Sequence, residues 1–248
     1  MRMPVNNRTA LRVWLGRWIG LLSILSVAGI AQAQVVMEGS RVVFPADREQ
    51  QAVSLKNMGE QPVLVQAWVS DGPADQPPEQ SRAPFALAPP VARLDAGKSK
   101  HVRIRQLRSA APTDHREHLY WLNVLAVPPQ VTGKEGSHLQ LVVRSRYKLL
   151  YRPPGLGEPT DPPAQLRIEA SAGGQQLVLR NTSPFYINLG YVFARWTGGA
   201  EQELDNPAVP PQGSVSIELP AQNASRPGAV RFAWIDDQGT LHEVVRTL

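Results

Sequence analysis

Prolines and glycines divide most of this sequence into short segments, and this feature limits its fold more than any other. The chain has 23 prolines and 19 glycines, and most of them lie after residue 33. The runs between them are rich in valine, leucine and aromatic residues, and signals for helices are nearly absent. Short runs of this kind, bounded by turn residues, are typical of β-strands. The sequence therefore predicts an all-β protein.

Residues 1–33 are predicted to be a secretion signal that is removed. Four arginines and no acidic residue precede an apolar run from Trp18 to Ile30, and Ala31-Gln32-Ala33 has the small-x-small pattern of a cleavage site. The alternative is a retained membrane anchor, which needs about 20 apolar residues to cross the bilayer. Because this run is shorter, we expect an exported chain that begins near Gln34 and is not embedded in a membrane.

Charge and cysteine content narrow the possible functions of the remaining chain. Without the four arginines of the signal, 22 Lys and Arg residues stand against 21 Asp and Glu residues. The chain is then nearly neutral, so no global basic field points to nucleic acid. The sequence has no cysteine, which excludes disulfides, thiol chemistry, iron–sulfur clusters and cysteine-bound zinc.

The predicted strands form two groups on either side of Arg152-Pro153-Pro154-Gly155. These four residues cannot continue a sheet ladder, so we place the domain boundary there. The predicted strands are residues 41–44, 51–56, 62–69, 99–106, 118–127 and 139–151 before the boundary, and 165–169, 175–181, 185–193, 214–219, 230–235 and 242–246 after it. Their spacing predicts an antiparallel sandwich in residues 34–153 and a smaller one in residues 154–248.

The segment from Leu139 to Tyr151 is the most unusual of these strands. Side chains alternate between the two faces of a strand. One face is mainly apolar and the other carries three cations. The first holds Leu139, Leu141, Val143, Ser145, Tyr147 and Leu149, and the second Gln140, Val142, Arg144, Arg146, Lys148 and Leu150. In an ordinary strand the apolar face would cover the domain's own core and the cations would face water. A nucleic-acid groove is disfavoured, because no aromatic residues interleave with the cations on their face.

Several segments together resemble the signatures of a known protein family. They are residues 37–45 (MEGSRVVFP), 116–124 (REHLYWLNV) and 144–153 (RSRYKLLYRP), with further matches at residues 89–94, Gly97, 181–186 and 235–239. In this order, and in an exported protein, they are similar to periplasmic chaperones of the chaperone-usher pathway. The resemblance spans nearly the whole chain after residue 33.

The resemblance implies a fold and a function. The fold would be two immunoglobulin-like β-sandwich domains joined by a short hinge in a boomerang arrangement. The chain would be a non-enzymatic periplasmic chaperone that binds, folds and caps pilus subunits by lending them a β-strand, and that delivers them to an outer-membrane usher. No cofactor or metal is implied. Because exposed strand edges invite pairing, two alternatives stay open for the free protein, namely self-association through this strand or a disordered strand.

The resemblance also assigns roles to residues of this chain. Leu139, Leu141 and Val143 would fill the open groove of a subunit that lacks its last strand. Arg41 and Lys148 would bind the subunit's C-terminal carboxylate, although either residue alone would be interpreted as a solvated surface cation.

Three further residues would form a salt bridge between the two domains. They are Glu117, Arg152 and Asp237, and the alternative is that they are unrelated surface charges. One departure from the family pattern is that His115 splits its acid-Arg-Glu run, which affects the place of Asp114. The connection at residues 128–137 is short, as in chaperones that serve rod-forming or adhesive pili.

Two other classes of protein remain as alternatives. The five histidines include no H-E-x-x-H pair, and neither a G-x-S-x-G elbow nor a phosphate-binding loop occurs, so an enzyme would need residues dispersed along the chain. His115 and His118 are a weak metal hint. A secreted structural or adhesive protein is the second alternative, but pilus subunits in this system are single truncated domains that usually carry a disulfide.

Overall fold

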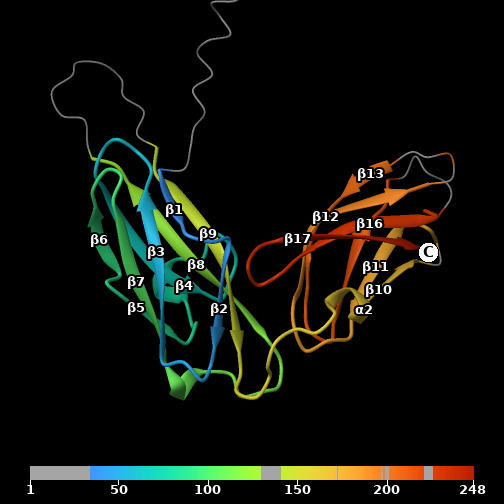
Figure 1. The fold of residues 1–248 in the computed structure, drawn as a ribbon, viewed down its shortest axis with the longest axis horizontal. Coiled ribbons are helices and arrows are strands. Elements are labelled where there is room, and N and C mark those ends of the chain that lie inside the picture. The colour runs from blue at the N-terminus through green and yellow to red at the C-terminus, as the bar shows by residue number, and fades with distance from the viewer. Residues whose placement is uncertain (1–33, 130–140, 172, 197, 199–200, 221–225) are drawn as a thin grey trace, which may run out of the picture. The chain divides into compact units, whose positions relative to one another are not determined.

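The computed structural model describes residues 34–129, 141–171, 173–196, 198, 201–220 and 226–248 (Figure 1). The predicted signal at residues 1–33, Leu139, and most of the short connection at residues 128–137 lie outside the described residues. The described chain is all-β, as the sequence predicted. Its one α-helix is α2 (Pro162–Gln165), where Asp161 caps the first turn by accepting a hydrogen bond from the Ala164 amide.

The first domain consists of two sheets packed around one core. The four-stranded sheet has the order β1 (Val35–Met37), β3 (Gln50–Asn57), β7 (Ser99–Gln106) and β5 (Phe85–Ala88). The five-stranded sheet has the order β2 (Arg41–Pro45), β9 (Val143–Arg152), β8 (His118–Val127), β4 (Val63–Ser70) and β6 (Val91–Leu94). All neighbouring strands are antiparallel except β2 and β9, which are parallel.

Alternating side chains explain why these strands form a sandwich. In β4, Val63, Val65, Ala67 and Val69 are buried, whereas Leu64 and Gln66 between them are exposed. The period of two matches a strand with one face on the core. The core holds Phe44, Leu55, Ile104, Leu122 and Leu149, each at most 1% exposed.

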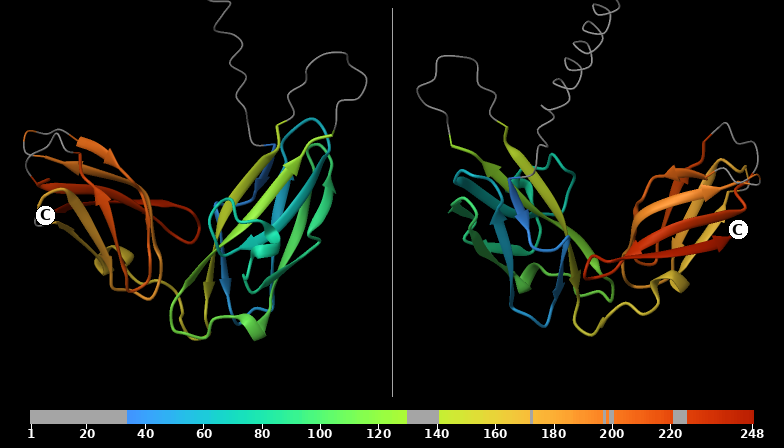
Figure 2. Two further views of the ribbon diagram at one scale, coloured as in Figure 1. Left: turned by 180° about the vertical axis from the view of Figure 1, so that it is seen from behind. Right: turned by 45° about the horizontal axis from the view of Figure 1, so that its top comes forward.

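The second domain repeats this plan with its own core. One sheet has the order β10 (Leu166–Ala170), β11 (Gln176–Asn181) and β15 (Ser214–Glu218). The other has the order β13 (Glu201–Leu204), β12 (Ile187–Arg195), β16 (Ala229–Ile235) and β17 (Leu241–Thr247), and β14 (Ala208–Val209) pairs with the start of β12. Figure 2 shows both sandwiches from two further directions.

Every strand predicted from the sequence has a counterpart in the structure. Most bounds differ by a few residues, and the predicted 139–151 strand begins at Val143. Five short strands were missed, namely β1, β5, β6, β13 and β14. Each has four residues or fewer, and so short a segment cannot display a clear alternating pattern.

The pairing of β9 changes along its length. On one side it pairs with β8 from Val143 to Tyr151. On the other side it pairs with β2 only from Lys148 to Arg152. No described strand pairs with residues 143–147 on that second side, and β1, which precedes β2, pairs with β3 in the other sheet. We call this side of residues 143–147 the open edge.

Candidate functional site

Exposed apolar side chains lie where the open edge begins. Leu141 is 64% exposed, Val142 50% and Val143 39%. Isolated exposed apolar residues are common on protein surfaces, whereas a continuous group of them marks a contact surface. Here three consecutive residues adjoin backbone groups that no described strand occupies. The arrangement provides both the main-chain groups and the apolar side chains that strand pairing requires.

The opposite side chains of β9 are packed on the sheet itself. The Arg144 guanidinium lies 4.7 Å from the centre of the Trp68 ring, and that of Arg146 lies 4.4 Å from the centre of the Trp121 ring. Arg144 also donates two hydrogen bonds to Asn123 Oδ1, at 3.1 and 2.7 Å. In an ordinary exposed strand these two cations would face water. Here both guanidinium groups are stacked on tryptophan rings. The stacks hold this face of β9 against β8 and β4.

Arg41 and Lys148 lie side by side at the end of the open edge. They are direct partners in the parallel pairing of β2 with β9. The Lys148 Nζ donates to Asn188 Oδ1 at 2.7 Å. The Arg41 guanidinium makes two long contacts of 3.4 Å, to the Ser40 hydroxyl and to the Ile235 carbonyl. Among the described residues, no carboxylate forms an ion pair with either cation, so most of their donor groups remain available.

Burial perturbs both of these cations. It removes the Lys148 ammonium from water and, together with the charge of Arg41, lowers the pKa of Lys148 to about 8. Burial also lowers the pKa of Arg41, although the charges of Asp237, Asp236 and Glu117 act in the opposite direction. Two like charges held together and partly desolvated favour the binding of an anion, because an anion would relieve both effects.

Glu117, Arg152 and Asp237 form one connected network. The Arg152 Nε donates to Glu117 at 2.8 Å, and its two terminal nitrogens donate to the two oxygens of Asp237 at 2.8 and 2.7 Å. Glu117 is 3% exposed and Arg152 6%. Glu117 also accepts a hydrogen bond of 2.8 Å from the Tyr186 amide. Two of these charges are buried and Asp237, with its side chain 27% accessible, is partly exposed. All three are hydrogen-bonded and come from distant parts of the chain, in contrast to scattered surface charges.

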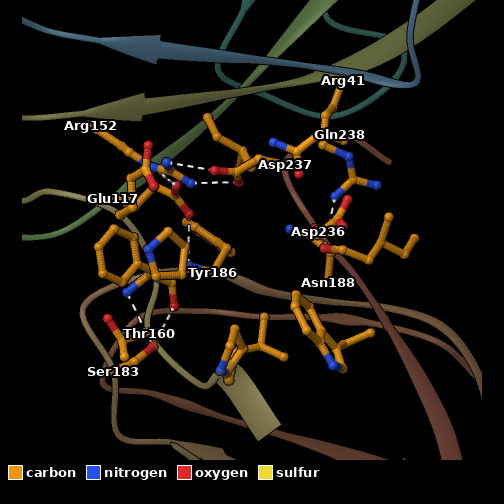
Figure 3. Close-up of a pocket in the computed structure, with 18 residues that line it drawn as sticks. Arg41, Glu117, Arg152, Thr160, Ser183, Tyr186, Asn188, Asp236, Asp237 and Gln238 are labelled. Atoms are coloured by element: carbon orange, nitrogen blue, oxygen red, sulfur yellow. Dashed lines mark hydrogen bonds and ion pairs between the residues drawn. The ribbon is translucent and has the colours of Figure 1, made fainter. Parts of the chain in front are cut away.

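The charges within this network affect one another. Burial raises the pKa of Glu117, and the adjacent Arg152 opposes this shift. For Arg152, burial favours the neutral form, but the hydrogen bonds and charges of Asp237 and Glu117 outweigh it and raise the pKa. Figure 3 shows Arg152 between its two carboxylate partners in a pocket that Arg41 and Asn188 also line. Arg41, one of the two carboxylate-binding candidates, and the salt bridge thus border a common pocket, and Asn188, the partner of Lys148, lines it too.

His115 splits the acid-Arg-Glu run of the family, and Asp114 lies outside the network of Glu117, Arg152 and Asp237. Asp114 pairs with Arg116 at 2.9 Å and with His118 at 2.5 Å. His118, which with His115 was a weak candidate for metal binding, therefore has a carboxylate partner. No group of metal-binding side chains with suitable geometry occurs among the described residues. In the same part of the chain, no helix is long and apolar enough to cross a membrane.

Sequence reasoning missed several residues of this site. Trp68 and Trp121 belong to β4 and β8, and their place beneath Arg144 and Arg146 follows from the pairing of three strands. Asn188 is the second residue of β12 in the second domain, and it lies two positions after the segment 181–186 that carries part of the resemblance. No local pattern marks it, because its contact with Lys148 joins residues 40 positions apart.

Comparison with known families decides the identity of the chain. Residues 34–157 match the family described as pili and flagellar-assembly chaperone, PapD N-terminal domain, and residues 161–244 match pili assembly chaperone PapD, C-terminal domain. The chain belongs to the PapD family of pilus assembly chaperones. This confirms the family inferred from the sequence segments. Because the family is not enzymatic, the enzyme interpretation is excluded.

Individual relatives agree with this assignment. The chaperone is 41% identical to the chaperone protein FimB/FhaD of Bordetella pertussis over 177 residues, which cover 69% of this chain and 72% of that protein. It is 32% identical to the probable fimbrial chaperone YehC of Escherichia coli over 223 residues, which cover 89% of this chain and 90% of that protein.

Solved structures show the same fold. The YadV chaperone matches with a TM-score of 0.74 at 30% identity, covering 87% of this chain and all of that one. The SafB chaperone of Salmonella enterica, solved in complex with the SafA pilin, matches with a TM-score of 0.73 at 29% identity. That match covers 89% of this chain and 99% of the other. The prediction of two immunoglobulin-like sandwiches is thereby confirmed.

Proposed function

We propose that this chaperone binds pilus subunits at the open edge of β9, completes their fold with its own strand, and passes them to an outer-membrane usher. The observation that carries the proposal is the combination at one strand of an open edge, exposed apolar side chains and a pair of available cations. A related chaperone has been solved in complex with a pilin, which supports the same class of partner for this chain.

The open edge would take up a strand of the subunit. Main-chain groups of residues 143–147 would pair with it, and alternate side chains would enter the subunit's groove, which is strand addition. Leu141 and Val143 are exposed at the start of β9, and Leu139 continues their alternation outside the described residues. Full burial of one aliphatic side chain contributes about 1.5–3 kcal/mol. Association and ordering costs reduce the net affinity.

Arg41 and Lys148 would define where the added strand ends. From Lys148 onward, β2 occupies the edge of β9, so a strand that enters along residues 143–147 must stop there. A terminal carboxylate offers a charge and two acceptor oxygens, which Arg and Lys can bind through charge-assisted hydrogen bonds. An added strand whose C-terminus lies at Lys148 would run parallel to β9. Such an end point would also prevent a one-residue slip, which would turn every apolar side chain to the wrong face.

Glu117, Arg152 and Asp237 would stabilise the junction of the two domains, with residues 34–153 as the first and 154–248 as the second. Asp237 belongs to the second domain, as do Asn188 and Ile235, which contact the two cations. We infer that the salt bridge keeps these contacts in place. Its buried charges are strongly interdependent, because removal of one partner would leave another without compensation.

Residues 1–33 would direct the chain to the periplasm and be removed there, which accords with the family's role in pilus assembly. The partners are then the pilus subunits and the usher. The open edge would also allow two free chaperones to associate, since exposed strand edges pair readily.

Co-purification with a pilin tests the proposal. We would express the tagged chaperone in a bacterial periplasm with a candidate pilin and identify the proteins that co-elute. We expect a pilin with the wild type and none with an Arg41→Ala, Lys148→Ala double variant. A Lys100→Ala, Arg103→Ala variant is the matched control, because both cations are exposed on β7. Absence of a pilin from the wild-type eluate would contradict the proposal, and its retention by the double variant would remove these residues from the site.

A further inference from the structure

The position of the Lys148 ammonium depends on a residue of the second domain. The Lys148 Nζ donates a hydrogen bond to Asn188 Oδ1 at 2.7 Å. Asn188 is 3% exposed. It is the second residue of β12, and its backbone pairs with that of Ala208 in β14. A buried side chain on a paired strand has little freedom to move. Asn188 can therefore hold the end of a flexible lysine in one place.

The chemical type of this partner matters as much as its position. An amide oxygen accepts a hydrogen bond from an ammonium but carries no charge. A carboxylate in the same place would form an ion pair and reduce the positive charge that an incoming anion meets. The Glu117 and Asp237 carboxylates close by are already bonded to Arg152, and Asp236 is bonded to His242 at 2.7 Å. Neither cation is therefore paired with a carboxylate of the described residues.

We propose that Asn188 is a positioning residue of the subunit-binding site, which orients the Lys148 ammonium without neutralising it, so that both cations remain available for the terminal carboxylate of a bound pilus subunit. The inference rests on the proposed function. It assigns the second domain a direct part in carboxylate recognition, and it explains why a neutral side chain occupies a buried position next to a cation.

Peptide-binding measurements can separate the contribution of the terminal carboxylate to affinity from that of the rest of the added strand. The probes are two synthetic peptides with the sequence of the C-terminal 15 or so residues of the co-purified pilin, one with a free C-terminal carboxylate and one with an amidated C-terminus. For the wild type we expect the free acid to bind at least roughly tenfold more tightly than the amide, since hydrogen bonds between charged groups are strong. For Lys148→Ala we expect this ratio to fall, and for the Arg41→Ala, Lys148→Ala double variant we expect it to approach one.

Asn188→Asp is the decisive variant because it keeps the shape and adds a charge. We expect the acid-to-amide ratio to fall to within about threefold, since the new carboxylate competes for Lys148. The pH at which binding of the free acid declines should also rise, because a bonded carboxylate favours the protonated lysine. The other charged groups around the site are unchanged in this variant; they are Arg41, Glu117, Arg152, Glu158, Asp236, Asp237 and His242. A purely structural role for Asn188 would leave the pH of the decline where it is in the wild type.

Asn188→Ala keeps the inference testable if the aspartate variant does not fold. It removes the acceptor without adding a charge, so the acid-to-amide ratio should again fall several-fold. A wild-type ratio in either folded variant would overturn the role of Asn188. Failure of the wild type to bind both peptides would contradict strand donation, and equal binding of both would contradict the carboxylate anchor. These results separate the inference from the proposed function.

Discussion

At the scale of single residues, Lys148 shows how the environment of a side chain changes its chemistry. Burial and the neighbouring Arg41 lower its pKa to about 8. An exposed lysine would remain charged well above that pH. Close to neutral pH, Lys148 can therefore lose its proton far more readily than the exposed lysines of the chain.

This lowered pKa predicts that subunit binding depends on pH. A bound carboxylate stabilises the ammonium, so the pKa of Lys148 should be higher in the complex than in the free protein. Affinity should be greatest below about pH 8 and should decline as the pH rises through the pKa of the complex. Titration calorimetry with the free-acid peptide between pH 6 and pH 10 measures this.

Lys148→Arg is the control for that measurement. Arginine stays charged throughout this range, so the variant should show no comparable decline. An identical decline in the variant would mean that a group other than Lys148 is responsible.

At the scale of elements, one part of β9 belongs to the sheet and core of its own domain, and another part leaves its edge open for a partner. From Lys148 onward it pairs with β2 and β8 and contributes Leu149 and Tyr151 to the core. Before Lys148, its β2 side is the open edge, and Leu141 and Val143 are exposed. The stacked pairs Arg144–Trp68 and Arg146–Trp121 keep this part in place on β8 and β4.

Because Leu141 is exposed, a substitution there can weaken subunit binding without affecting the stability of the chaperone. Leu141→Glu should change the free energy of unfolding little, because this side chain is 64% exposed. Subunit recovery should nevertheless fall strongly, since a charge buried in an apolar groove without a partner is costly. Co-purification and urea denaturation measure the two effects.

Met58→Glu is the matched control for Leu141→Glu. Met58 is 52% exposed but lies in the turn after β3, outside the open edge. Its substitution should leave subunit recovery unchanged. Wild-type recovery with Leu141→Glu would argue against donation of this face of β9.

At the scale of the whole molecule, the network of Glu117, Arg152 and Asp237 connects parts of the chain that are far apart in sequence. Arg152 closes β9, Glu117 precedes β8, and Asp237 follows β16. Because Arg152 bonds both acids, its loss would affect the two domains together.

Arg152→Met should therefore destabilise the protein substantially. The variant leaves Glu117 buried without its cation, and breaking a buried ion pair in this way costs about 3–5 kcal/mol. The free energy of unfolding from urea denaturation tests this value. The control is Arg93→Met, whose ion pair with Asp95 is largely exposed, with side chains 71% and 62% accessible. It should cost less than about 1 kcal/mol.

The amino-acid pattern alone determined the fold class, most strands, and the residues that carry the family resemblance. Alternation in segments such as 63–69 and the interruption at residues 152–155 are local properties, and they can be read without the folded chain. The same holds for Arg41 and Lys148 as candidates, which followed from segments that resemble a family.

Only the tertiary structure decided how these residues act together. The open edge exists because β2 pairs with β9 only from Lys148 onward and β1 pairs with β3 in the other sheet, and a sequence pattern does not state which strands are neighbours. The stacking of Trp68 and Trp121 under two arginines, and the hydrogen bond from Lys148 to Asn188, join distant positions. Such contacts depend on strand order and on the packing of side chains from different strands, which no local periodicity encodes.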